Sequence, residues 1–165
     1  IGFDVAEYLT HERPAPAEDR QRFFDEWGVD PTLSHEAGLV KPDPEPSPRE
    51  VWLLQRTDAK PGKGLGKTSG WVHRASLKHK GVHMMGGVSY ERIDDAGLHI
   101  RVNDETRVLA VDTVAICAGQ QTRRELADAL GARGIKTHVI GGAQLAAELD
   151  AKRAIREAAE LAAGL

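Results

Sequence analysis

The sequence is poor in cysteine and lacks any long apolar run. Cys117 is the only cysteine among 165 residues, so the chain can build neither an internal disulfide nor a cysteine-based metal or iron–sulfur site. A reducing, cytoplasmic setting is therefore expected. No apolar run approaches the roughly 20 residues that span a bilayer, and the first residues carry Asp4 and Glu7 in place of the basic region of a secretion signal.

The sequence also lacks a strong excess of charge of either sign. Its net charge is −3 and its pI is about 6.2, which excludes a general electrostatic attraction to nucleic acid or to an anionic membrane. Apolar residues make up 41% of the chain, enough for a real core. Any basic binding site must therefore be local.

Proline is distributed very unevenly along the chain. Seven of the eight prolines lie between Pro14 and Pro48. We interpret residues 11–49 as an excursion that follows an amphipathic helix ending near Thr10 and contains one short helix at 20–27.

The rest of the chain alternates apolar runs with helical patterns. Predicted helices cover 69–80, 123–130 and 145–162, and predicted strands cover 51–55, 82–85, 89–94, 98–103, 106–110, 113–117 and 137–140. Polar turns at 94–97 and 103–105 make three of the strands a meander. The β-α-β-α order of the last 50 residues predicts a parallel sheet covered by helices, with ligands at the carboxyl ends of its strands. The predicted fold is α/β and Rossmann-like, of the FAD/NAD(P)-binding type.

A basic stretch follows the first of these strands. Residues 51–80 hold seven Lys or Arg and a single acid, among them Gln55-Arg56 at the strand end and then Lys60, Lys63 and Lys67. In a Rossmann unit the end of the second strand meets the adenine ribose, where a carboxylate selects NAD and an Arg accommodates the 2′-phosphate of NADP. The stretch favours NADP, with a solvated basic loop as the alternative.

A P-loop is a further interpretation of residues 62–68, since Gly66-Lys67-Thr68 closes that motif. The motif requires a glycine five residues before Gly66, where this chain has Pro61. Proline has no backbone N–H for a phosphate, so an NTPase is not predicted.

Small residues mark two turns near the carboxy-terminal end. Gly119-Gln120 follows the strand predicted at 113–117, and Gly142-Ala143 follows the one at 137–140 and precedes the final helix. Backbone can approach a ligand closely at such turns, although each could be an ordinary tight turn. Trp71 lies directly behind the basic stretch, where it could stack on a nicotinamide or an adenine, or belong to the core.

Six segments together resemble bacterial NADPH-dependent 2,4-dienoyl-CoA reductases, in their carboxy-terminal part. They are IGFD at 1–4, LQR at 54–56, PGKGLGKTSGW at 61–71, VAICAGQ at 114–120, IGGA at 140–143 and ELDAKRAI at 148–155. The resemblance covers nearly the whole chain, and it implies a partial NADPH-binding domain at 1–110 and the end of a FAD-binding domain at 111–165.

The resemblance also implies an activity. Such an enzyme takes hydride from NADPH into FAD and passes electrons through an iron–sulfur cluster and FMN to a 2,4-dienoyl-CoA in fatty-acid degradation. The FMN, the cluster and the barrel that carries them belong to a part of the enzyme that precedes this chain. The expected partners are therefore NADPH, flavin and that barrel. No catalytic residue is assigned here, and the isolated chain is expected to be inactive.

The site residues that the resemblance implies bind cofactor. Gly2 is the last glycine of the dinucleotide fingerprint; Gln55 and Arg56 contact the NADP ribose phosphate, with Lys60, Lys67 and Trp71 nearby; and Gly119, Gln120, Gly142 and Ala143 line the flavin. Related flavoproteins have an Asp where this chain has Gly142, so contact there would use backbone. The alternative function is a stand-alone nucleotide-binding or interaction module without turnover. A third reading, an electron-transfer flavoprotein like trimethylamine dehydrogenase, is disfavoured by the basic stretch.

Overall fold

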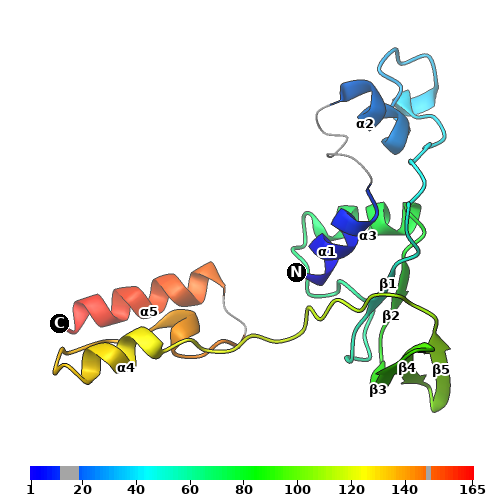
Figure 1. Cartoon of the computed structure of the whole chain (residues 1–165). Helices are drawn as coiled ribbons and strands as arrows, with labels where there is room; N and C mark the ends of the chain where they lie inside the picture. Colours follow the sequence, from blue (N-terminus) through cyan, green and yellow to red (C-terminus); the bar gives the residue numbers. More distant parts are fainter. Residues whose placement is uncertain (12–18, 148–149) are drawn as a thin grey trace. The chain divides into compact units, whose positions relative to one another are not determined.

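The computed structural model describes residues 1–11, 19–147 and 150–165. The chain divides into two compact units, Ile1–Ile116 and Cys117–Leu165 (Figure 1). The boundary between the two units falls after residue 116, whereas the domain boundary predicted from the sequence lies after residue 110. The assignment of the two parts to NADPH and FAD binding stays a prediction.

Unit 1 is built around a β-α-β crossover. Strand β1 (Trp52–Leu54) leads through helix α3 (Gly70–His79) to strand β2 (His83–Met85), and the two strands pair in parallel. Helix α1 (Gly2–Leu9) packs beside α3 and β1. The predicted helices and both strands are confirmed here to within two residues.

The small parallel sheet has a core on each face, because neighbouring side chains of a strand point to opposite sides. Leu53 and Met84 pack toward the helices, against the buried side chains of Ala6, Leu77 and Val82. Trp52, Leu54 and Met85 pack on the opposite face, against Val88, Leu98, Ile100 and Leu109. The sheet therefore links the helices to the strands that follow.

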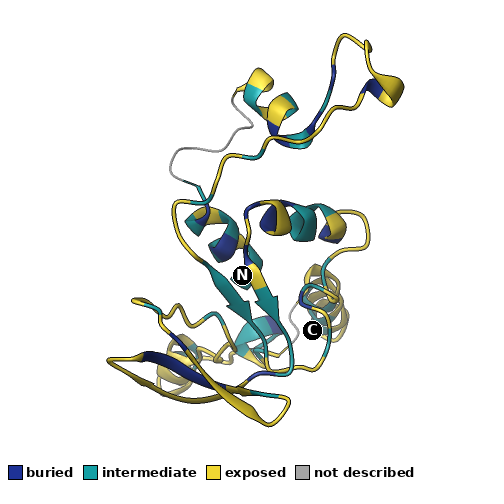
Figure 2. Cartoon of the chain, turned by 90° about the vertical axis from the view of Figure 1, so that its right-hand side faces the viewer, coloured by how far each residue is buried: buried dark blue, intermediate teal, exposed yellow. Residues whose placement is uncertain are grey.

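Those strands form the predicted meander, β3 (Ser89–Asp94), β4 (Gly97–Val102) and β5 (Glu105–Leu109), in one antiparallel sheet. Asn103 and Asp104 both have positive φ, 51° and 63°, as a two-residue hairpin loop of type I′ requires. Figure 2 shows β4 as a mostly buried strand between two mostly exposed ones.

The described part of the proline-rich excursion has structure of its own. Helix α2 (Arg20–Trp27) begins where the Asp19 side chain accepts hydrogen bonds from the backbone N–H groups of Gln21 and Arg22. It ends at Gly28, whose φ is 66°. Val29 and Leu39 form an isolated antiparallel β-bridge. The segment between them contains a 3₁₀ turn, η2 (Glu36–Gly38). The helix predicted at 20–27 is confirmed, while residues 12–18 of the excursion lie outside the described residues.

Unit 2 contains helix α4 (Glu125–Gly131), the 3₁₀ turn η3 (Gly141–Ala143) and helix α5 (Ala151–Ala163). The strands predicted at 113–117 and 137–140 are wrong, and so is the parallel sheet that they were to form. A strand requires hydrogen-bonding neighbours, and neither run pairs with a strand in the described residues; Ile116 is 83% exposed.

The final helix begins later than the sequence predicted. Asp150 caps α5 by accepting a hydrogen bond from the backbone N–H of Arg153, a favoured N-terminal signal. Residues 145–147 are not helical, and residues 148–149 lie outside the described part. Gly142-Ala143 therefore do not lead directly into the long helix. In the described parts of the chain, no helix is both long and apolar enough to cross a membrane.

Candidate functional site: a cationic pocket on α3

Unit 1 carries a hollow of about 450 Å³ that we call the cationic pocket. Its walls are Lys60, Pro61, Trp71, Arg74, Ala75, Lys78 and Met84. Three of these side chains are positively charged and none is acidic. The pocket therefore suits an anionic ligand that also has an apolar or aromatic part.

Helix α3 supplies one wall of the pocket through a single stripe of side chains. Trp71, Arg74, Ala75 and Lys78 recur at spacings of three and four residues, which places them on one face of the helix. Met84, from strand β2, is a further residue of the pocket lining. The loop after β1 contributes Lys60 and Pro61 to the lining.

A hydrogen bond joins α3 to the glycine-rich loop. Arg74 donates from Nη1 to the carbonyl oxygen of Gly62 over 2.9 Å. Gly62 has φ of 78°, and a Cβ there would lie 2.6 Å from Cζ of Phe3, so only glycine passes this point without strain. The loop is thus held between α1 and α3, with Lys60 and Pro61 at the pocket.

Within the part of the chain that the structure describes, no neighbouring acid neutralises the pocket's positive charges. None of the ion pairs among the described residues involves Lys60, Arg74 or Lys78. Each unit charge retains its attraction for an incoming anion. Arg74 is partly buried, which reduces solvent screening of its charge, whereas Lys60 and Lys78 are exposed.

The sequence-predicted nucleotide residues fall into two groups. Lys60 and Trp71 line the pocket, and Trp71 is 59% exposed, so the alternative of a core tryptophan is wrong. Arg56 and Lys67 are exposed but do not line it. Gly2 is the first residue of α1.

Gln55 is held by the loop that follows β1. Its side-chain amide Nε2 donates to the carbonyl oxygens of Thr57 at 3.0 Å and of Ala59 at 2.7 Å. The amide nitrogen braces the loop just before Lys60. A contact from Gln55 to a ribose phosphate would have to replace these bonds.

The flavin residues that the sequence predicted all lie in unit 2. Gly119 has φ of 81°, and Gln120 beside it is exposed. Gly142 and Ala143 belong to η3. Among the described residues, no hydrogen bond joins these two turns, so the structure does not show them as one site.

Charged side chains fix the turn that contains Gly142. Glu157 accepts a hydrogen bond from the backbone N–H of Gly141 at 2.6 Å. Arg124 donates to the carbonyl oxygens of Ala143 at 3.0 Å and Gln144 at 2.6 Å. Because these carbonyls and the N–H of Gly141 are already engaged, a ligand at this turn would meet backbone N–H groups other than that of Gly141.

Sequence reasoning missed Arg74 and Lys78. Both are visible as a helical stripe with Trp71, once 69–80 is taken as a helix. Met84 could not be found in this way, since its place depends on how β2 packs beside α3.

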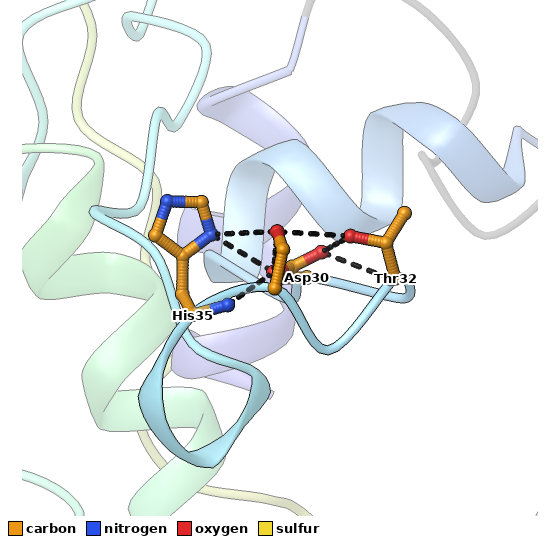
Figure 3. Close-up of polar contacts among 4 residues, drawn as sticks. Asp30, Thr32 and His35 are labelled. Atoms are coloured by element: carbon orange, nitrogen blue, oxygen red, sulfur yellow. Dashed lines mark hydrogen bonds and ion pairs between the residues drawn. The ribbon is translucent and has the colours of Figure 1, made fainter.

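A second polar cluster surrounds the buried carboxylate of Asp30, as Figure 3 shows. It accepts hydrogen bonds from the backbone N–H and hydroxyl of Thr32 at 2.9 and 2.6 Å, the hydroxyl of Ser34 at 2.8 Å, and the backbone N–H and Nδ1 of His35, both at 2.9 Å. The bonds from Thr32, followed by those from His35 and Ser34, hold the pKa of Asp30 well below its ordinary value. Since all the donors serve one carboxylate within six residues, the cluster stabilises a turn.

Comparison with known proteins gives a point of reference for the fold. No family model matches the chain. The structure is similar to that of a 2-naphthoyl-CoA reductase determined in complex with 2-naphthoyl-CoA, with a TM-score of 0.55 and 21% sequence identity, over 66% of this chain and 16% of that protein. The likeness is one of fold, and the chain spans only about one sixth of that protein's length.

Proposed function

We propose that this chain is the nucleotide-handling part of a flavin-dependent reductase and that the cationic pocket binds the phosphate groups of NADPH. The observation that carries the proposal is the meeting of three cations, Lys60, Arg74 and Lys78, around one exposed indole. None of the three forms an ion pair within the part of the chain that the structure describes. Phosphate groups match guanidinium and ammonium donors, and the face of Trp71 suits the flat ring of a nucleoside.

The position of the pocket in the fold supports a dinucleotide. It adjoins the loop that follows β1 in a parallel β-α-β unit. The resemblance makes β1 the second strand of a Rossmann domain, and the end of that strand meets an adenine ribose. Arg56 stands at the end of β1 in place of the carboxylate that would favour NAD. A Rossmann-like role for unit 1 and a preference for NADPH are part of the proposal.

The reaction class rests on two supports. The protein of similar fold is by name a reductase of a CoA thioester, and the six sequence segments described above resemble 2,4-dienoyl-CoA reductases. We therefore propose a CoA thioester as the substrate of the whole enzyme, with a 2,4-dienoyl-CoA as the specific form. FAD would contact unit 2 at Gly119, Gln120, Gly142 and Ala143, and FMN and an iron–sulfur cluster would belong to the rest of the enzyme.

The pocket residues offer more contacts to NADPH than the unit 2 residues offer to a flavin. The pocket's cations suit the phosphates of NADPH, which when bound supplies a hydride. In unit 2 the carbonyls of Ala143 and Gln144 are taken by Arg124, which leaves backbone N–H groups as the donors toward a flavin.

Titration of the chain with NADPH and NADH tests the proposal. Lys78→Ala removes one pocket cation, and we expect it to weaken NADPH binding tenfold or more, since a charge-assisted phosphate contact contributes about 1.5–3 kcal/mol. Lys63→Ala is the matched control, because Lys63 is an exposed cation of the loop between β1 and α3 that does not line the pocket. Equal affinity for both nucleotides, or equal effects of the two variants, would contradict the assignment.

One observation favours a second candidate, a nucleotide-binding module without turnover. The strands expected beside Gly119 and Gly142 are absent from the described residues, so a flavin site in unit 2 lacks the sheet that usually supports one. Adding FAD to the chain and following the flavin absorbance and fluorescence separates the two. NADPH binding without any change of the flavin spectrum supports the module.

A further inference from the structure

The C-terminal end of α3 is attached to the proline-rich excursion by a buried lysine. Lys80 follows the last residue of α3, and its side chain is only 1% exposed. Its ammonium group lies 3.2 Å from Oε1 of Glu26 in α2 and donates to the carbonyl oxygen of Glu45 at 2.9 Å. We call these three residues the Lys80 clasp.

The excursion side of the clasp is held in place by further contacts. Glu45 forms an ion pair with Arg22 of α2. The backbone N–H of Asp43 donates to the carbonyl oxygen of Asp25 at 2.8 Å, which ties the chain before Glu45 to the helix. Glu26 and the Glu45 carbonyl therefore reach Lys80 as one preformed acceptor pair.

A tilted contact between two rings adds to the same attachment. The ring of Trp27 lies 6.0 Å from that of His79, the last residue of α3. An ammonium group taken out of water is costly unless it is paired and hydrogen-bonded. Lys80 is satisfied in this way only when the excursion is docked, so the end of α3 and the excursion must move together.

The clasp is close in sequence to the pocket. Lys78 stands two residues before Lys80, within the last turn of α3, and the Lys80 backbone N–H closes that turn on the carbonyl oxygen of buried Ser76 at 3.0 Å. Helix ends fray unless their last groups are held. Holding Lys80 therefore also holds the backbone that carries Lys78.

We infer that Glu26 and Lys80 are positioning residues of the cationic pocket, and that the proline-rich excursion sets the pocket's affinity for its anionic ligand by ordering the last turn of α3. The identity of that ligand rests on the proposed function. The link between clasp and pocket rests only on the contacts above.

The test compares four forms of the full chain, the wild type, Lys80→Met, Lys80→Arg and Lys78→Met. NADPH affinity is measured by calorimetry, and amide hydrogen exchange is followed over residues 74–79. We expect Lys80→Met to weaken NADPH binding on the order of tenfold, as mutations that act on a site without contacting its ligand can do. The same variant should exchange the amide hydrogens of the last turn of α3 faster. Lys80→Arg, which keeps the charge and donors, should restore both.

Lys78→Met separates positioning from direct contact, because it should weaken binding without changing exchange. If Lys80→Met does not fold, Glu26→Gln removes the opposite charge with little change of shape. A folded clasp variant with wild-type exchange and affinity overturns the inference. If the wild type binds no NADPH, the proposed function fails, while unchanged exchange in the clasp variants would still overturn the positioning role.

Discussion

The guanidinium of Arg74 and the backbone carbonyl of Gly62 are joined by a hydrogen bond of 2.9 Å between residues twelve positions apart. This bond fixes the glycine-rich loop to the helix that forms the pocket wall. The conformation of the loop is therefore stabilised by contacts with Phe3 of α1 and Arg74 of α3, in addition to its own glycines.

Gly62→Ala should both destabilise unit 1 and weaken ligand binding. The new Cβ would meet the Phe3 ring at 2.6 Å in a backbone with φ of 78°, which we expect to cost about 1–3 kcal/mol. Chemical denaturation and NADPH titration measure the two effects. Gly64→Ala is the control, since nothing lies within 4 Å of a Cβ there; equal losses in both variants would contradict the packing of this loop.

Leu77→Ala should remove a central part of the helix-side core. The Leu77 side chain is fully buried between α1, α3 and the parallel strands. Truncation of a buried leucine costs about 2–5 kcal/mol through lost burial and the cavity left behind. Urea unfolding checks this value. Leu126→Ala, at a leucine that is 74% exposed, should change the free energy of unfolding far less.

Asp104→Gly should stabilise the meander. Asp104 has φ of 63° at the second position of the hairpin loop between β4 and β5, where glycine is preferred in type I′ turns. We expect a gain of about 0.5–1 kcal/mol, seen as a higher melting temperature. Asp95→Gly, in the other hairpin loop but without positive φ, should give no gain. A lower melting temperature for Asp104→Gly would show that this turn is not of the stated type.

The Asp30 cluster should make the excursion sensitive to acid. Hydrogen bonds from Thr32, His35 and Ser34 lower the pKa of Asp30 from its ordinary value of 3.8. A carboxylate with a depressed folded-state pKa adds stability above the unfolded value, and that stability is lost as the pH falls below about 4. Asp30→Asn should therefore be less stable at neutral pH and show a shallower loss of stability on acidification.

Unfolding by urea at neutral and acidic pH, followed by tryptophan fluorescence, measures this difference. Asp43→Asn is the control in the same segment, because the Asp43 carboxylate accepts no hydrogen bond among the described residues. Parallel pH profiles for the wild type and Asp30→Asn would contradict the role of the cluster.

Elements with local signals were predicted well. The helix at 20–27 carries its own cap at Asp19 and its own stop at Gly28, and the meander carries its turns at Asn103 and Gly97. Such signals act between neighbours in the chain and need no distant partner.

The two strands predicted in unit 2, which require a distant partner, were predicted wrongly, whereas β1 and β2 find each other and were predicted correctly. The apolar runs at 113–117 and 137–140 have the composition of buried strands, but a strand exists only when another strand pairs with it. In the described residues no such partner is present, and the runs have no regular secondary structure and are exposed or only partly buried.

The candidate site shows the same division between local and tertiary information. By itself the sequence determined a basic, glycine-rich segment after a buried strand, and it predicted Lys60 and Trp71 as nucleotide-binding residues. Charge and residue type need no knowledge of the fold. Only the tertiary structure decided that Arg74, Lys78 and Met84 line the same pocket. It further decided that the Gln55 side chain donates its hydrogen bonds to the loop after β1. It also decided that a lysine beyond the pocket is buried against Glu26. These facts depend on which elements pack together, and packing is settled by the whole core.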